Sequence, residues 1–135
     1  MKYRILIVSA NYYTDISNNL LKDAKTTLKS KAKYQVINVP GVFEIPVIIA
    51  KNIKKYHGFI ALGCVIKGET PHFDFISNTT INAIMNLSIV HKKPIGNGIL
   101  TCLYKRQAKA RSGSFNKVGK GTEAAKAVLS VLNNS

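Results

Sequence analysis

The chain has 135 residues, enough for one domain with a hydrophobic core, and we expect a single domain over residues 1–135. Its formal net charge is +14, yet only three of the 20 basic residues are arginines, and no stripe of arginines and aromatics occurs. We therefore expect anionic small substrates rather than nucleic acid. The sequence has no signal-peptide pattern and no apolar run long enough to span a bilayer. Its two cysteines are far apart in the sequence. They are more typical of buried thiols in a reducing cytoplasm than of a metal site or a disulfide.

Strand-like and helix-like segments alternate along the chain. The predicted strands span residues 3–9, 34–39, 58–64 and 95–101. The predicted helices span residues 17–31, 44–56, 73–90, 105–111 and 121–132. Alternation of this kind favours right-handed crossovers and a parallel sheet that is covered on both faces. We therefore expect an α/β fold, a three-layer α/β/α sandwich around a four-stranded parallel sheet.

The predicted helix over residues 73–90 is apolar around most of its circumference. One face can cover the sheet, and the rest must be buried elsewhere or form a contact surface. Self-association is the natural hypothesis. The alternative, a helix buried entirely within one subunit, is hard to fit into so small a domain.

The unusual residues collect where the predicted strands end. Asn11, Tyr12 and Tyr13 follow the first strand, the segment 39–44 follows the second, and the segment 63–74 follows the third. Ligands of open α/β sheets bind beyond the carboxyl ends of the strands. These loops are therefore predicted to build one pocket.

The loop over residues 63–74 combines the features of an anion site with a titratable side chain. Gly68, Glu69 and Thr70 could bind a phosphate through backbone N–H groups and the Thr70 hydroxyl, at the start of a helix whose dipole favours an anion. Thr70 also suits an ordinary helix N-cap. His72 is a candidate general acid and base because imidazole titrates near neutral pH, although a lone histidine is more often structural.

Two residues outside this loop suggest further contacts with a ligand. Tyr12 could stack on a flat ring, and Arg111 could hold an anion from the penultimate helix. Either side chain could equally belong to an ordinary surface. Taken together, these residues indicate an α/β enzyme that uses a phosphorylated substrate.

Several motifs of this chain resemble the signatures of one enzyme family. They are the segments 41–46 (GVFEIP), 62–74 (LGCVIKGETPHFD), 98–101 (GILT) and 120–125 (KGTEAA), with Gln107, Ala108 and Arg111 between the last two. In combination they are similar to 6,7-dimethyl-8-ribityllumazine synthases. The agreement in spacing runs from Tyr12 almost to the end of the chain.

The resemblance implies a transferase that catalyses the penultimate step of riboflavin biosynthesis. Its reaction condenses 5-amino-6-(D-ribitylamino)uracil with 3,4-dihydroxy-2-butanone 4-phosphate to 6,7-dimethyl-8-ribityllumazine, and phosphate and water leave. The resemblance further implies that no metal and no organic cofactor takes part. It also implies a flavodoxin-like subunit and active sites shared between neighbours in a homopentamer.

The resemblance also assigns roles to individual residues. It implies that Tyr12 stacks on the pyrimidine and that His72 moves protons. The positions implied to bind the pyrimidine and the ribityl chain are Tyr12, Val42, Phe43, Glu44, Cys64, Val65, Ile66 and Asn97. The positions implied to bind phosphate are Gly68, Glu69, Thr70 and Arg111.

Three departures from the family pattern concern the neighbouring subunit and the assembly. Asn97 occupies a position where many members have an aromatic residue that the adjacent subunit donates. The segment 112–119 differs from the compact loop of many cage-forming members, and the chain starts directly at its first strand. We therefore expect an isolated pentamer, or a pair of pentamers, rather than a shell of sixty subunits.

Two other functions stay open at this stage. A relative that binds flavin or lumazine without catalysis would keep the pocket. Asn97 leaves this alternative open, whereas His72 and Arg111 argue against it. A basic α/β protein that binds nucleic acid would be retained on DNA in a salt-dependent manner.

Overall fold

The computed structural model describes residues 2–113 and 119–134, and its strands form one parallel sheet in the order β2-β1-β3-β4. The strands are β1 (Tyr3–Ala10), β2 (Ala32–Val39), β3 (Gly58–Ile66) and β4 (Ile95–Cys102). The helices are α1 (Thr14–Leu28), α2 (Ile45–Lys51), α3 (Phe73–His91), α4 (Lys105–Arg111) and α5 (Lys120–Asn133). Two short 3-10 helices, η1 (Val42–Glu44) and η2 (Lys67–Glu69), follow β2 and β3. Residues 114–118 of the unusual segment 112–119 lie outside the described residues.

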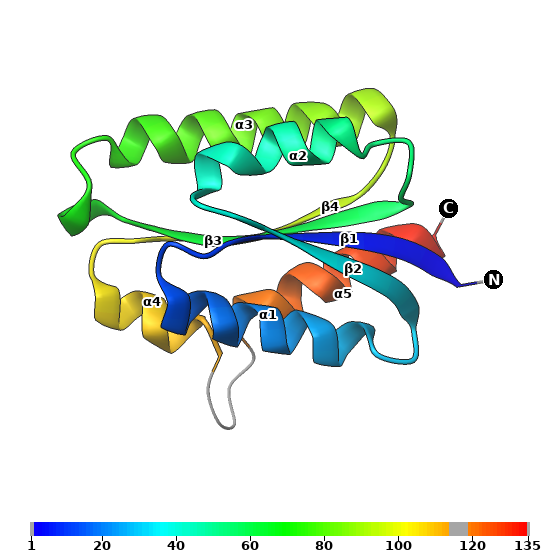
Figure 1. Ribbon diagram of the computed structural model, residues 1–135, viewed down its shortest axis with the longest axis horizontal. Coiled ribbons are helices and arrows are strands. Elements are labelled where there is room, and N and C mark those ends of the chain that lie inside the picture. Colours follow the sequence, from blue (N-terminus) through cyan, green and yellow to red (C-terminus); the bar gives the residue numbers. More distant parts are fainter. Residues whose placement is uncertain (1, 114–118, 135) are drawn as a thin grey trace.

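The sheet is covered on both faces, which confirms the predicted three-layer α/β/α sandwich. Figure 1 shows α2 and α3 on one face and α1, α4 and α5 on the other. Strand β3 is buried along its whole length, because it lies inside the sheet and both of its faces meet helices. Alternate residues of β1 and β3 therefore belong to two separate hydrophobic cores, one on each side of the sheet.

The loops beyond the carboxyl ends of the strands are tied to one another by backbone hydrogen bonds. The N–H of Asn11, after β1, donates to the Val39 carbonyl at the end of β2, with an N–O distance of 3.0 Å. The N–H of Gly68, after β3, donates to the Leu103 carbonyl after β4 at 3.2 Å. These bonds therefore join the loops after β1 and β2, and the loops after β3 and β4, at the carboxyl ends of the strands.

The first helix begins three residues earlier than predicted, at Thr14 instead of Ser17, and ends at Leu28 rather than at residue 31. In the structure, Ser17 is buried inside α1, and its hydroxyl donates to the Ala10 carbonyl at 2.6 Å. This bond joins the start of α1 to the end of β1.

The second helix is shorter than the predicted span of residues 44–56. It starts as the 3-10 turn η1, continues as α2 and ends at Lys51, after which the chain turns. The ammonium group of Lys93 donates to the carbonyls of Ile53 and Tyr56 at 2.6 and 2.9 Å. These carbonyls therefore have a hydrogen-bond donor from a distant segment. They do not need a backbone N–H donor from a continued helix.

Helix α3 is covered by the rest of this chain on one side only. Phe75, Met85, Ile89 and Val90 have exposed fractions of 58–71%. The alternative that α3 is buried entirely within one subunit is therefore wrong. The exposed residues leave an apolar surface that suits a protein contact.

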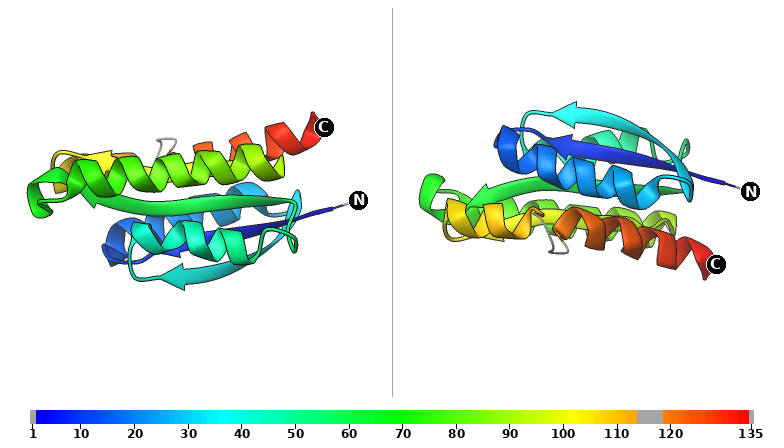
Figure 2. Two further views of the ribbon diagram at one scale, coloured as in Figure 1. Left: turned by 90° about the horizontal axis from the view of Figure 1, so that it is seen from above. Right: turned by 90° about the horizontal axis from the view of Figure 1, so that it is seen from below.

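The two ends of the described chain lie on the same side of the molecule, at the amino ends of the strands. Figure 2 shows them opposite the loops that contain η2 and the start of α4. No helix in the described part of the chain has the length and apolar character needed to cross a membrane.

Candidate active site

A cavity of about 330 Å³ lies between the loops that follow β1, β2 and β3. Most of the predicted binding residues line it, namely Tyr12, Val42, Phe43, Glu44, Cys64, Val65, Ile66, Glu69 and Thr70. Ligand pockets are commonly concave and apolar with a few polar groups that set orientation. The cavity has this character, since aliphatic side chains and one thiol lie beside the carboxylates of Glu44 and Glu69.

The wall between η1 and β3 depends on a glycine inside a strand. A Cβ atom at Gly63 would lie 2.5 Å from Cγ1 of Val42 and 3.1 Å from Cβ of Ala10. Glycine in a strand interior often marks such a close approach. The absence of a side chain at Gly63 thus lets η1 pack directly on the strand that carries Cys64 and Val65.

Glu44 is held in place by a capping interaction. Its Oε1 accepts a hydrogen bond from the N–H of Gly41 at 3.0 Å, and the side chain is half-buried. An ionised carboxylate can accept several hydrogen bonds. Glu44 can therefore fix the η1 turn and still accept a hydrogen bond from a hydroxyl group of a ligand.

Two consecutive tyrosines form the opposite wall of the cavity. The rings of Tyr12 and Tyr13 meet edge to face, with centroids 4.9 Å apart and an angle of 81° between their planes. Tyr12 is 75% exposed, whereas Tyr13 is half-buried. An exposed ring held by a neighbour is available for stacking with a flat ligand.

The Cys64 thiol lines the cavity as a neutral group. Burial, with smaller contributions from Cys102 and Glu69, raises its pKa to about 12. The reactive form of cysteine is the thiolate, so Cys64 is not activated as a nucleophile at neutral pH. The thiol can instead pack against a ring.

His72 lies beside the cavity rather than inside it. The side chain is exposed at the start of α3 and borders a neighbouring hollow that shares Thr70 with the cavity. His72 itself holds the N-cap position, and its N–H donates to the Thr70 hydroxyl at 3.3 Å. Thr70 is therefore not the helix N-cap, and its side chain braces the turn that presents His72.

Two predicted residues lie away from the cavity. Arg111, at the end of α4, borders a separate hollow with Thr101 and Lys120 beside the outer strand β4. Asn97 is exposed on β4, and its Oδ1 accepts the N–H of Ile99 at 3.0 Å. One chain therefore gathers most of the predicted site but separates Arg111 and Asn97 from it.

The family model described as 6,7-dimethyl-8-ribityllumazine synthase matches residues 2–135. The chain belongs to this family. It is 46% identical to the 6,7-dimethyl-8-ribityllumazine synthase of Bartonella henselae, with 97% of this chain and 87% of the relative covered. The synthase of the same name from Agrobacterium fabrum is 45% identical, with coverages of 97% and 93%. A protein from Rhodopseudomonas palustris, named 6,7-dimethyl-8-ribityllumazine synthase 1, is 44% identical, with coverages of 95% and 85%.

Membership of the lumazine synthase family establishes the reaction class. The protein is a transferase of riboflavin biosynthesis, and it condenses 5-amino-6-(D-ribitylamino)uracil with 3,4-dihydroxy-2-butanone 4-phosphate. Within the described residues, no group of three or more histidine, cysteine, aspartate or glutamate side chains is arranged to hold a metal ion.

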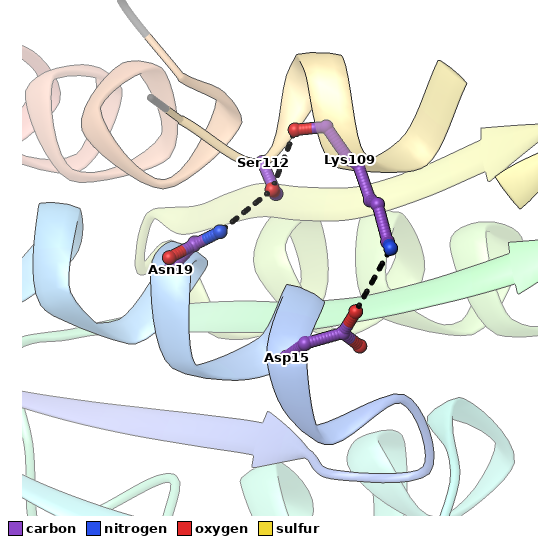
Figure 3. Close-up of polar contacts among 4 residues, drawn as sticks. All are labelled: Asp15, Asn19, Lys109 and Ser112. Atoms are coloured by element: carbon purple, nitrogen blue, oxygen red, sulfur yellow. Dashed lines mark hydrogen bonds and ion pairs between the residues drawn. The ribbon is translucent and has the colours of Figure 1, made fainter. Parts of the chain in front are cut away.

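Polar contacts between α1 and α4 hold the helix that carries Arg111 in this lumazine synthase. The side-chain amide of Asn19 donates to the hydroxyl of Ser112 at 3.3 Å, and that hydroxyl donates to the Lys109 carbonyl at 2.9 Å (Figure 3). The Lys109 ammonium also lies 3.7 Å from the Asp15 carboxylate. Ser112 is fully buried, so the end of α4 is anchored next to Arg111.

Sequence reasoning placed Tyr13 among the residues after the first strand but gave it no role, whereas the structure shows it lining the lumazine synthase cavity. Tyr13 follows Tyr12 at the end of the first strand, and this position indicates a place near the predicted pocket. Whether its ring turns into the cavity depends on the path of the loop, which the residue order does not specify.

Proposed function

We propose that the cavity binds the pyrimidine substrate, with its ring against Tyr12 and its ribityl chain at η1. The observation that carries this proposal is the gathering of Tyr12, Glu44 and Cys64 around one largely apolar space. Tyr12 offers an exposed ring face, and Glu44 offers a positioned acceptor for hydroxyl groups. Val42, Phe43, Val65 and Ile66 supply the apolar lining, and Asn97 approaches the ring from a neighbouring subunit.

The phosphate of the second substrate is proposed to bind near Thr70 and His72, with Arg111 as its cationic partner. Arginine binds phosphate through several charge-assisted hydrogen bonds. The amide of Gly68 already donates to Leu103, so this group has a partner within the chain. The remaining contribution of the η2 turn to phosphate binding comes from the backbone of Glu69 and from Thr70.

The chemistry requires proton transfers beside an anionic leaving group. The amino group of the pyrimidine attacks the ketone and water leaves to give an imine, the imine then eliminates phosphate, and the second amine closes the ring with loss of another water. His72 is proposed to move protons in these steps, since its exposed imidazole lies beside the cavity and can both accept and donate a proton. Holding two substrates in register supplies much of the remaining rate acceleration.

Replacement of His72 by alanine is expected to lower kcat about hundredfold, the lower end of the range for general acid–base catalysis, without abolishing turnover. The variant still positions both substrates, but water has to transfer the protons in place of the imidazole. Steady-state kinetics with both substrates provides the measurement. His91→Ala, which removes an exposed histidine at the other end of α3, is the matched control. An unchanged kcat for His72→Ala would remove the residue from the mechanism.

We further propose a homo-oligomer, a pentamer or a pair of pentamers, with active sites at subunit interfaces. Two observations support it. The apolar surface of α3, formed by Phe75, Met85, Ile89 and Val90, is uncovered within the chain. Arg111 and Asn97 lie beside the outer strand, apart from the cavity, so a neighbouring copy is needed to complete the site.

We propose that this single-domain enzyme works in the cytoplasm, where its two buried free thiols remain reduced.

Light scattering is expected to give the mass of five or ten copies of the 14.8 kDa chain, about 74 or 148 kDa. Ile89→Glu should lower this mass, because it places a charge on the apolar surface of α3. Thr26→Glu, on the exposed side of α1, is the control and should leave the mass unchanged. A mass near that of sixty copies, about 890 kDa, would contradict the small assembly.

A further inference from the structure

A second hollow lies at the amino ends of β1 and β2, at the opposite end of the sheet from the candidate active site. Its volume is about 370 Å³, and residues of β1, of β2 and of the turn after α2 line it. Three of them are cations, two are phenols and one is an amide, namely Arg4, Lys33, Lys55, Tyr34, Tyr56 and Gln35. Among the described residues, no carboxylate lines this amino-end hollow.

The acidic side chains of the protein lie elsewhere. The chain has only six of them, against 20 basic ones. Four of the six follow the carboxyl ends of β1, β2 and β3, namely Asp15, Glu44, Glu69 and Asp74. Within the described residues, the only ion pair joins Lys109 to Asp15. The cations of the amino-end hollow therefore have no acidic partner in the described part of the chain.

The sheet holds two of these cations side by side. Arg4 of β1 and Lys33 of β2 are register partners in parallel pairing, and neighbouring strands lie about 4.8 Å apart. Register partners project from the same face of a sheet, and like charges placed there repel each other. An anion bound between them would relieve this repulsion.

The polar groups of the amino-end hollow are positioned as donors. Nε and Nη2 of Arg4 donate to the Lys55 carbonyl at 3.3 and 3.0 Å, which fixes the plane of the guanidinium and uses only part of its donor capacity. The Tyr56 hydroxyl donates to Oε1 of Gln35 at 2.6 Å. This bond occupies the amide oxygen, so the amide N–H groups of Gln35 can donate to a ligand.

We propose that the amino-end hollow is a second anion site, which binds a small multivalent oxyanion of the phosphate or pyrophosphate type. A fixed guanidinium is suited to such an anion because it makes several charge-assisted hydrogen bonds in one plane. A cleft lined by charges of one sign also focuses the electrostatic potential that attracts the ligand. The site is separate from the candidate active site and does not depend on where the two substrates bind.

Isothermal titration calorimetry of the full-length protein with inorganic pyrophosphate tests this site. The starting protein is Arg111→Ala, which lacks the arginine assigned to the substrate phosphate, and it should still bind pyrophosphate. Adding Arg4→Gln and Lys33→Gln should weaken this binding at least about tenfold, because charge-assisted hydrogen bonds are lost. Absence of pyrophosphate binding to Arg111→Ala would overturn the proposal.

The matched control is the pair Lys22→Gln and Lys29→Gln, again added to Arg111→Ala. It removes two exposed lysines of α1, on the sheet face opposite α2 (Figure 1). Its affinity for pyrophosphate should change less than about twofold, since charges exposed to solvent are screened over this distance. An equal loss of affinity in both pairs would show an effect of net charge alone and would overturn the proposal.

Thermal unfolding tests the repulsion independently. Without added anion, Lys33→Gln should raise the melting temperature by about 1–4 °C, because it removes the like charge beside Arg4. Lys31→Gln, at an exposed position just before β2, is the control and should leave the melting temperature unchanged. A melting temperature that Lys33→Gln lowers or leaves unchanged would overturn the proposal.

Two further measurements distinguish other occupants of the amino-end hollow. A single-stranded RNA oligonucleotide presents the same phosphate chemistry on a polymer. Binding of RNA by a protein that does not bind pyrophosphate would make this face a nucleic-acid surface and overturn the proposal. Light scattering of Arg4→Gln with Lys33→Gln should give the mass of the unmodified protein, and a lower mass would show that the hollow contacts a neighbouring subunit instead.

Discussion

Gly121→Ala is expected to lower the free energy of unfolding by about 2–3 kcal/mol, the cost of overpacking a tight contact. The sign opposes helix propensity, because alanine in place of glycine within a helix normally stabilises by about 1 kcal/mol. A Cβ atom at Gly121 would lie 3.0 Å from the carbonyl carbon of Leu20 and closer still to its oxygen. These are backbone atoms of α1, so a side-chain rotation cannot relieve the clash.

The consequence extends to the active site because α1 follows the loop that carries Tyr12 and Tyr13. A shift of α1 away from α5 would move that loop relative to β3. Thermal unfolding followed by circular dichroism measures the stability change. All variants must be compared at one protein concentration, since the stability of an oligomer depends on it.

Lys126→Ala is the matched control for Gly121→Ala. It also introduces an alanine into α5, but at an exposed position. Its melting temperature should remain close to that of the unmodified protein. Equal or greater stability of the Gly121→Ala protein would mean that α1 and α5 can separate without cost.

Arg111→Ala is expected to raise the KM for 3,4-dihydroxy-2-butanone 4-phosphate about tenfold to hundredfold, the range for losing hydrogen bonds to a charged group. The KM for the pyrimidine should change little, because Arg111 is assigned to the phosphate. The guanidinium is exposed at the end of α4, and its Nη1 lies 3.8 Å from the sulfur of Cys102. Steady-state kinetics with each substrate varied separately gives both values.

A second exposed arginine on the same helix serves as the control. Arg106 lies at the start of α4, with its guanidinium 5.7 Å from the ring centroid of Tyr104. Arg106→Ala removes the same charge from the protein without touching the proposed phosphate site. If both variants raised the KM equally, the effect would come from the overall positive charge rather than from a specific contact.

The cores of the strands and the order of elements were predictable from the sequence. The apolar run 59–62 marks β3 because a strand buried on both faces shows no polar alternation. The strand continues to Ile66, two residues beyond its predicted end, because Val65 and Ile66 still pair with β4 and are buried. The helix boundaries were less predictable, since they depend on contacts with distant segments. The start of α1, for example, is tied to β1 by the hydrogen bond from the Ser17 hydroxyl to the Ala10 carbonyl.

The candidate site was only partly predictable. The loop over residues 63–74 indicated an anion site from its glycines, threonine and histidine. The structure shows that the amide of Gly68 is bonded to Leu103, a residue 35 positions away in the chain. Such a bond leaves no local signal in the sequence, because it depends on how the ends of β3 and β4 are placed in the sheet.

By itself, the sequence determined the alternation of strands and helices and the chemistry available at the ends of the strands, because periodicity and turn residues are local properties. Only the tertiary structure decided which of those residues share a cavity. It brings Tyr12, Tyr13, Glu44, Cys64 and Thr70 together and leaves Arg111 beside the outer strand. The physical reason is that such neighbours are set by packing between distant segments, where one missing side chain at Gly63 or Gly121 determines how closely two elements approach.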